Sequence, residues 1–276
     1  MLYSEHIKLK EKNMKQRIIS AAVLIAIIAV CAPFELTRVL LVGASGIACA
    51  YEFVTNLKSK GIRCTSWVLY LYLCVQALLA ATHSGLMAYI AWYAASVFLS
   101  LFSGVLHKDV SGKGALCTLA VLSYPCFLFA MMLIIVTSAR WIQTISIACV
   151  SVWLCDSFAL FGGKRFGKHL LAPEVSPKKT VEGCLCGAVM SVAGGVLVYI
   201  VSRYLLPIPF IPCIVTALVS STLGQIGDLS ESLVKRFLGV KDFSNLIPGH
   251  GGMLDRIDSL LFAIPAAYFC FYIFGL

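Results

Sequence analysis

The sequence predicts an all-α polytopic integral membrane protein with about nine transmembrane helices and a cytoplasmic N-terminus. Hydrophobic residues make up 60% of the 276 residues and charged residues only 13%, whereas soluble domains carry about 25% charged residues. Apolar runs recur from Ile18 to the C-terminus, with no soluble-looking block between them. Residues 1–276 are therefore expected to form a single polytopic membrane domain, and a soluble enzyme is excluded.

The first helix is expected over residues 18–34, after a segment rich in lysine. A basic segment before an apolar run resembles a secretory signal peptide, but no small-residue cleavage site follows, so we expect this helix to be retained. Several runs have only about 17 residues, the lower limit for a span, and eight crossings with one re-entrant segment are an alternative. The other helices are expected over residues 37–56, 66–82, 86–106, 115–137, 142–162, 184–205, 210–229 and 257–275.

Basic residues predict the orientation, because Lys and Arg concentrate in cytoplasmic loops. With the N-terminus inside, 19 of the 22 basic residues, Lys108 among them, fall on the inner side, and only Arg38, Arg140 and Arg203 fall outside. The two longest polar stretches, residues 163–183 and 230–256, then share the cytoplasmic face. Chemistry on a water-soluble substrate is expected on that face, and the motifs for it concentrate between residues 150 and 260.

Acidic residues within or beside apolar helices are functional candidates, because a carboxylate there is costly unless it is paired or coordinates a cation. Asp156 lies well inside an apolar run, and Asp228 follows the end of another. Asp255 and Asp258 open the last helix, and their three-residue spacing places them on one helix face. Asp228 and Glu231 have the same spacing.

These carboxylates are suited to a divalent cation, since Mg²⁺ binds one or two carboxylates together with water and phosphate oxygens. Asp228, Asp255 and Asp258 are candidate ligands, provided that the helices carrying them meet at their cytoplasmic ends. In the alternative interpretation, Lys235 and Arg256 only neutralise them as interfacial ion pairs. Spacing alone does not separate the two.

Glycine-rich and basic segments near these carboxylates suggest phosphate binding, because glycine backbones approach phosphate closely and cations oppose its charge. Residues 162–168, 176–183 and 248–252 have this composition, although lysines beside a membrane often only mark the inner side. His250, between two glycines, is expected to contact phosphate or to hold the turn by hydrogen bonding. Gly183 and Gly187 form a small-xxx-small step suited to close helix contact.

The stretch from Ser232 to Asp258, SLVKRFLGVKDFSNLIPGHGGMLDRID, resembles the signature of the phosphatidate cytidylyltransferase family, also called CDP-diacylglycerol synthases. The upstream run from Trp153 through Lys179 to Gly183 is similar to the same family. The resemblance covers about residues 150 to 260, and the first five helices match only in general polytopic character.

The resemblance implies an enzyme of phospholipid biosynthesis that condenses CTP with phosphatidate to give CDP-diacylglycerol and pyrophosphate. It implies Mg²⁺ as the cofactor, with a second cation left open, and Asp228, Asp255 and Asp258 as metal ligands. Basic residues would contact the phosphates. The expected catalytic residues are Asp228, Asp255, Asp258, Lys235, Arg236, Lys241 and Arg256, and the expected substrate-binding residues are Ser176, Lys178, Lys179, Thr180, Asp156, His250, Gly251 and Gly252.

The expected partners are CTP, phosphatidate and the lipid bilayer, with a homodimer left open. Nucleic acid is not expected, because the net charge of +9 comes from short loops between apolar runs. The expected location is a bacterial-type plasma (inner) membrane, with the active site facing the cytoplasm. One alternative is a CTP-dependent lipid kinase of polyprenol type, which would release CDP. The other is an ion- or proton-coupled transporter, which the absence of an evident inverted repeat disfavours.

Overall fold

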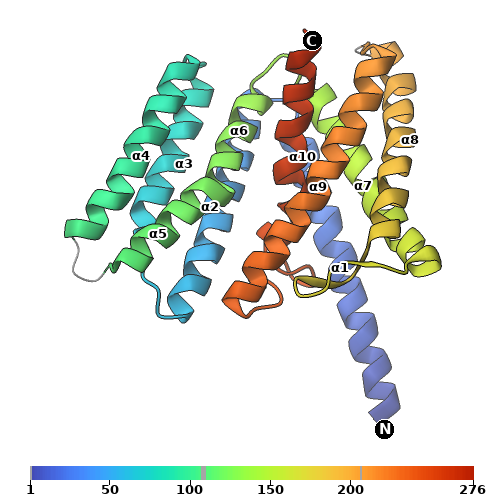
Figure 1. Ribbon diagram of the computed structural model, residues 1–276, viewed down its shortest axis with the longest axis horizontal. Coiled ribbons are helices and arrows are strands. Elements are labelled where there is room, and N and C mark those ends of the chain that lie inside the picture. The colour runs from blue at the N-terminus through green and yellow to red at the C-terminus, as the bar shows by residue number, and fades with distance from the viewer. Residues whose placement is uncertain (1, 107–109, 206) are drawn as a thin grey trace. The chain divides into compact units, whose positions relative to one another are not determined.

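The computed structural model describes residues 2–106, 110–205 and 207–276, and for residues 2–15, 204 and 205 it describes the backbone alone (Figure 1). The chain divides into two compact units. The first comprises Met1–Leu133 and Val240–Arg256, and the second comprises Ile134–Gly239 and Ile257–Leu276. Lys108, one of the basic residues behind the predicted orientation, lies outside the described residues.

The first unit contains the N-terminal helices. Helix α2 packs against α3, α3 against α4, and α4 against α5 (Figure 1). Its core includes the fully buried side chains of Leu57, Leu69, Tyr72 and Leu122. The last three residues of α6 belong to the second unit. The elements are α1 (Leu2–Cys31), α2 (Glu35–Ser59), α3 (Ser66–Ala81), α4 (Leu86–Leu106), α5 (Gly112–Val121), the π-helical turn η1 (Leu122–Cys126) and α6 (Phe127–Val136).

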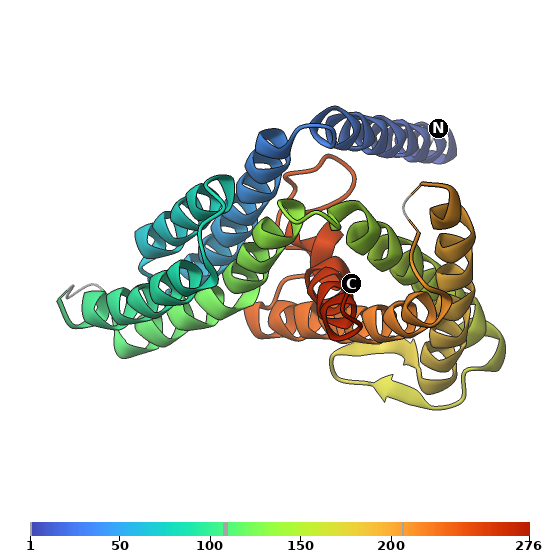
Figure 2. The same ribbon diagram turned by 90° about the horizontal axis from the view of Figure 1, so that it is seen from above.

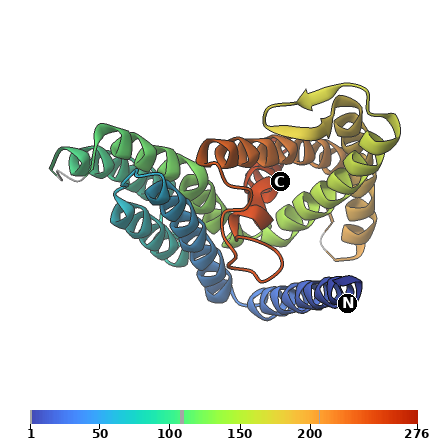
Figure 3. The same cartoon turned by 90° about the horizontal axis from the view of Figure 1, so that it is seen from below.

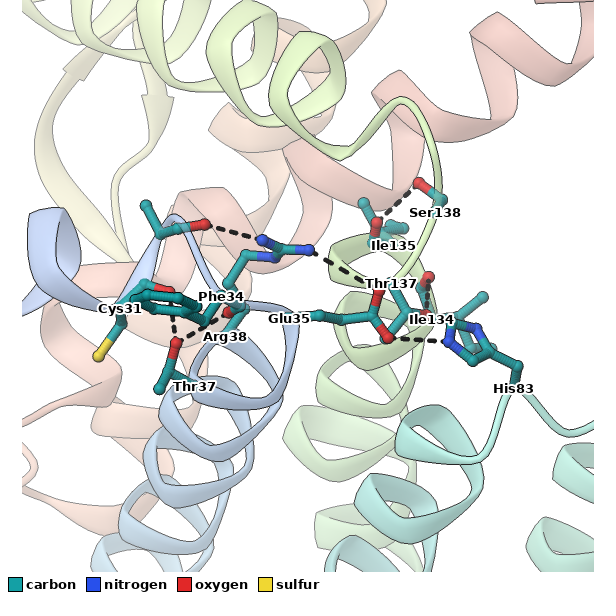
Figure 4. A network of polar contacts seen from close by, with 11 residues as sticks. Cys31, Phe34, Glu35, Thr37, Arg38, His83, Ile134, Ile135, Thr137 and Ser138 are labelled. Carbon is teal, nitrogen blue, oxygen red and sulfur yellow. Dashed lines mark hydrogen bonds and ion pairs between the residues drawn. The ribbon is translucent and has the colours of Figure 1, made fainter.

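Polar side chains fix the turn between α1 and α2 (Figure 4). The Thr37 hydroxyl donates to the carbonyl of Phe34 at 2.8 Å, and the Arg38 guanidinium donates to a carbonyl of the turn at 2.8 Å. Glu35, the first residue of α2, pairs with Nε2 of His83 at 2.9 Å. This pair joins the start of α2 to the turn that follows α3.

Besides the end of α6, the second unit contains three long helices, a β-hairpin and most of α10. Helices α7, α8 and α9 pack against one another, and the antiparallel hairpin lies beside α9 in two views (Figures 2 and 3). The hairpin is an addition to the predicted all-α fold: it occupies the polar segment between two helices that pack side by side. The elements are α7 (Trp141–Phe166), β1 (Leu170–Ala172), β2 (Ser176–Thr180), α8 (Val181–Leu205), α9 (Phe210–Leu238) and α10 (Leu254–Ile273).

The close packing of α7 and α8 depends on small residues, as the Gly183 and Gly187 step predicts. An added Cβ at Gly183 would lie 2.6 Å from the carbonyl oxygen of Ala159, and one at Gly187 would lie 2.7 Å from that of Cys155. Neither contact is possible without moving backbone. Glycine therefore sets how near the two helices approach.

The chain has the apolar helices of an integral membrane protein. Within the described ranges, seven helices are long and apolar enough to cross a membrane, and two shorter apolar helices, Gln16–Cys31 and Ser66–Ala81, accompany them. These segments correspond to the nine expected runs. The number of crossings and the cytoplasmic N-terminus stay predictions.

Most helices extend a few residues beyond their expected ends, and two extend much further. Helix α1 begins at Leu2 rather than at residue 18, and α9 ends at Leu238 rather than at residue 229. The polar end of α9 remains helical because Glu231 and Lys235 form an (i, i+4) ion pair along it. Gly239, with φ of 67°, then ends the helix in the left-handed conformation.

The glycine contact between α7 and α8 can be tested by a single methyl group. Gly187→Ala is expected to lower stability by about 1–3 kcal/mol, the usual cost of overpacking. Gly112→Ala is the matched control, because an added Cβ there meets nothing within 4 Å. Thermal unfolding of both variants in detergent gives the comparison, and equal melting temperatures would contradict the close contact.

Candidate functional site

Three carboxylates converge in the second unit. Asp228 and Glu231 lie one turn apart on α9, and Asp258 lies near the start of α10. One oxygen from each lies within 4.8 Å of the others. We call Asp228, Glu231 and Asp258 the carboxylate cluster.

Two lysines neutralise part of the carboxylate cluster. The Lys179 ammonium, on β2, lies 2.6 Å from Oδ2 of Asp228, and the Lys235 ammonium lies 2.5 Å from Oε2 of Glu231. The Glu231 side chain is fully buried, so its charge is costly without this pairing. Three carboxylates and two ammonium groups leave one net negative charge. Asp156, on α7, lies close enough to Asp228 to interact with it electrostatically, so acidic groups outnumber the two ammonium groups here.

The donor set of the carboxylate cluster fits a hard divalent cation, which takes oxygen ligands. Two of the three predicted ligands, Asp228 and Asp258, are brought together here. The third member is Glu231, which the predicted set does not contain. The signal for it is its three-residue spacing from Asp228, which places both on one face of α9.

Asp255 lies in the first unit and has backbone partners there. Its Oδ2 accepts hydrogen bonds from the N–H groups of Phe243 at 2.8 Å and Gly252 at 2.9 Å. The side chain of Arg256 is exposed. These contacts give Asp255 a role in shaping the loop between α9 and α10, and its place among the metal ligands stays a prediction.

The backbone of this loop largely satisfies its own hydrogen bonds. The N–H of His250 donates to the carbonyl of Ile247 at 2.9 Å, and Ile247 forms an antiparallel bridge with Gly251. Since Gly252 donates to Asp255, the amides at 250 and 252 are already engaged. Nδ1 of His250 is buried and has no hydrogen-bond partner among the described residues, so this atom does not hold the turn.

The hairpin holds half of the predicted substrate-binding residues: Ser176, Lys178, Lys179 and Thr180. The Thr180 hydroxyl accepts a hydrogen bond from the N–H of Gly183 at 3.2 Å, at the start of α8. Nε of Arg236, on α9, donates to the carbonyl of Val175 at 3.1 Å, in the turn between the strands. Arg236 and Thr180 thus stabilise the hairpin, which carries Lys179 to the carboxylate cluster.

The remaining predicted residues differ in exposure. Ser176, at the start of β2, is half-buried, whereas three basic side chains are exposed and available to an anionic ligand. Those three are Lys178 on the hairpin, and Lys241 and Arg256 in the first unit.

Two further glutamates shape this part of the chain, and neither is in the predicted set. Oε2 of Glu182 accepts hydrogen bonds from the N–H groups of Lys168 at 3.0 Å and His169 at 3.2 Å, and Oε1 lies 2.5 Å from Nδ1 of His169. Glu52 is buried in α2 of the first unit. The sequence feature that could have identified both is an acidic residue within or beside an apolar run.

The chain belongs to the cytidylyltransferase family, which matches it over residues 15–274. This match and the apolar helices identify an integral membrane member of that family.

Among individual relatives, a phosphatidate cytidylyltransferase of Thermotoga maritima is 31% identical over 270 residues, which cover 94% of this chain and 96% of the relative. One of Bacillus subtilis is 48% identical over 128 residues, 46% of this chain and 47% of the relative. One of Haemophilus influenzae is 43% identical over 127 residues, which cover 45% of this chain and 44% of the relative. The chain therefore spans about half the length of some curated relatives and nearly all of the Thermotoga protein.

The buried ion pair of the carboxylate cluster predicts an asymmetric response to mutation. Lys235→Met removes the counter-charge of a fully buried carboxylate, and is expected to destabilise the protein by about 3–5 kcal/mol. The double variant Lys235→Met/Glu231→Gln removes both charges and is expected to recover most of that loss. Lys178→Met, at an exposed lysine, is the control. Unfolding measurements in detergent that give Lys235→Met the stability of the control would refute the importance of this pair.

Proposed function

We propose that the chain is a phosphatidate cytidylyltransferase, which condenses CTP with phosphatidate to give CDP-diacylglycerol and pyrophosphate. The observation that carries the proposal is the carboxylate cluster with its two lysines. It lies in a chain that aligns over 94% of its length with a relative of that name.

The reaction needs no protein nucleophile, because the phosphate group of phosphatidate is itself an anion. One of its oxygens attacks the α-phosphorus of CTP and forms a new P–O bond. The bond from the α-phosphorus to the bridging oxygen breaks, and pyrophosphate leaves with the electron pair. The work of the protein is to bring two anions together and to neutralise their charge.

The residues of the second unit divide this work. Asp228, Glu231 and Asp258 would hold Mg²⁺, which supplies charge neutralisation at the phosphate oxygens when it is bound. Lys179 and Lys235, which contact two of these carboxylates, keep the site compact and place positive charge beside it. Lys178, which is exposed on the hairpin of the same unit, is the proposed contact for the substrate phosphates.

The substrates also argue for the location of the site. CTP is soluble in water and phosphatidate is embedded in lipid, so the reaction belongs at a bilayer surface. We place it on the cytoplasmic face of a bacterial plasma membrane. The support is the concentration of basic residues in the loops of one side, 19 against three.

The proposal predicts pyrophosphate release by purified protein supplied with CTP, phosphatidate in mixed micelles and Mg²⁺. Excess EDTA is expected to abolish the release, because three adjacent carboxylates need a cation to accept two anionic substrates, and added Mg²⁺ should restore it. Release of CDP instead of pyrophosphate would indicate the lipid kinase. Absence of any CTP turnover would contradict both enzymatic functions and favour the transporter. Full activity in excess EDTA would contradict the metal-dependent mechanism.

A further inference from the structure

We propose that Glu52, on α2, is a positioning residue for this reaction: it holds the first turn of α10, the helix that carries the acidic residues Asp255 and Asp258. The inference rests on the proposed function and extends it to the N-terminal half of the chain. The contacts that carry it lie within the first unit.

The Glu52 carboxylate is buried, with 2% of the residue exposed, and its oxygens accept three hydrogen bonds from the loop before α10 and from its first residue. Oε1 accepts from the N–H of Met253 at 2.8 Å and from the hydroxyl of Ser244 at 2.6 Å. Oε2 accepts from the N–H of Leu254 at 3.1 Å. All three donors lie about 190 residues or more further along the chain.

Two of these bonds supply acceptors for the backbone N–H groups at the start of α10, and the acceptors come from an unusual place. The first N–H groups of a helix lack intrahelical acceptors, and a negative charge there also interacts favourably with the helix dipole. An N-cap side chain usually supplies the acceptor from the adjoining residue. Here Asp255 takes the N–H of Gly252, while Glu52 takes those of Met253 and Leu254 from a different helix. The position of the first turn of α10 therefore depends on α2.

The space around Gly252 confirms how closely Glu52 fits. An added Cβ at Gly252 would lie 2.8 Å from both carboxylate oxygens of Glu52 and 3.0 Å from Oδ2 of Asp255. Any side chain at Gly252 would push one of the two carboxylates away. The glycine of the sequence signature thus makes room for Glu52.

The same face of α2 also holds the beginning of the loop. Asn56, one turn after Glu52, donates from Nδ2 to the carbonyl of Phe243 at 2.7 Å. The ring of Phe53 lies against that of Phe243, with centroids 5.5 Å apart. Because Phe243 also donates to Asp255, α2 contacts both ends of the segment that precedes α10.

Helix α1 holds the middle of this loop, which lies beside α1 and α2 in Figure 3. Nε of Arg17 donates to the carbonyl of Gly249 at 3.0 Å, and the Ser20 hydroxyl donates to that of Pro248 at 2.8 Å. These two bonds are exposed, whereas one bond of Glu52 is buried and the other two are part-buried, so Glu52 is the stronger restraint.

Loss of the Glu52 carboxylate is expected to reach the acidic residues through α10 itself. A helix moves as a rigid segment, so a displaced first turn moves Asp255 and, three residues later, Asp258. Residues that orient a metal ligand without touching the metal typically change metal affinity by about 10–100-fold when they are lost. The effect should therefore appear in the Mg²⁺ requirement and not only in the maximal rate.

The test compares Glu52→Gln with Glu35→Gln, the same change at a partly exposed glutamate that begins the same helix and pairs with His83 (Figure 4). In Glu52→Gln, the NH₂ of the side-chain amide replaces one carboxylate oxygen, so a hydrogen-bond donor faces a backbone N–H donor and that hydrogen bond is lost. The Mg²⁺ concentration for half-maximal pyrophosphate release is expected to rise roughly tenfold or more, and the amides of residues 243–254 are expected to exchange hydrogen faster. Glu35→Gln should match the wild type in both. A purely structural defect would instead lower the rate equally at every Mg²⁺ concentration.

A folded Glu52→Gln variant with wild-type Mg²⁺ dependence and wild-type loop exchange would overturn the inference. If Glu52→Gln does not fold, Ser244→Ala replaces it, since this change removes one of the three hydrogen bonds and keeps the carboxylate. Wild-type values for that variant on both measurements would overturn the inference as well. Absence of pyrophosphate release by the wild-type protein would overturn the proposed function instead, and loop exchange would still test the Glu52 contacts.

Discussion

A carboxylate beside a membrane requires a compensating positive charge, and this constraint governs how the second unit is built. Asp228 and Glu231 follow one another on α9, and each is compensated by a different lysine. Lys235 comes from the next turn of α9, so it needs only helical spacing. Lys179 comes from the hairpin, which must be held against α9 for the pairing to form.

The position of the hairpin depends in turn on the packing of α7 against α8. Glycines such as Gly187 let these helices approach closely, and the polar segment between them turns back as two short strands. Thr180 caps the start of α8, and Arg236 binds the hairpin turn. Small residues in the membrane-spanning helices thereby determine where the Lys179 ammonium lies in the polar segment. If the cluster holds Mg²⁺, the same contacts define the phosphate-binding region.

The sequence predicts local and periodic features of this protein better than it predicts long-range contacts. Apolar runs predict the helices, and the costs of intramembrane charge identify Asp228 and Asp258 as members of one site. The hairpin has no such signal, because its two short strands lie in a polar segment whose composition is that of a loop. The strands are brought together only when α7 and α8 pack side by side. The contacts of Glu52 have no signal in the sequence either, since its donors lie up to 202 residues away in the chain.

We propose that Asp228, Glu231 and Asp258 together bind a divalent cation. The most direct test is Mn²⁺ binding, followed by electron paramagnetic resonance of the free ion in titrations of the purified protein in detergent. The wild type is expected to bind Mn²⁺ saturably, and Asp258→Asn to bind it at least about tenfold more weakly, because a direct ligand matters at least as much as its supporting residues. Glu174→Gln, at an exposed position of the hairpin, should bind like the wild type. Equal Mn²⁺ affinity in the wild type and Asp258→Asn would contradict the account.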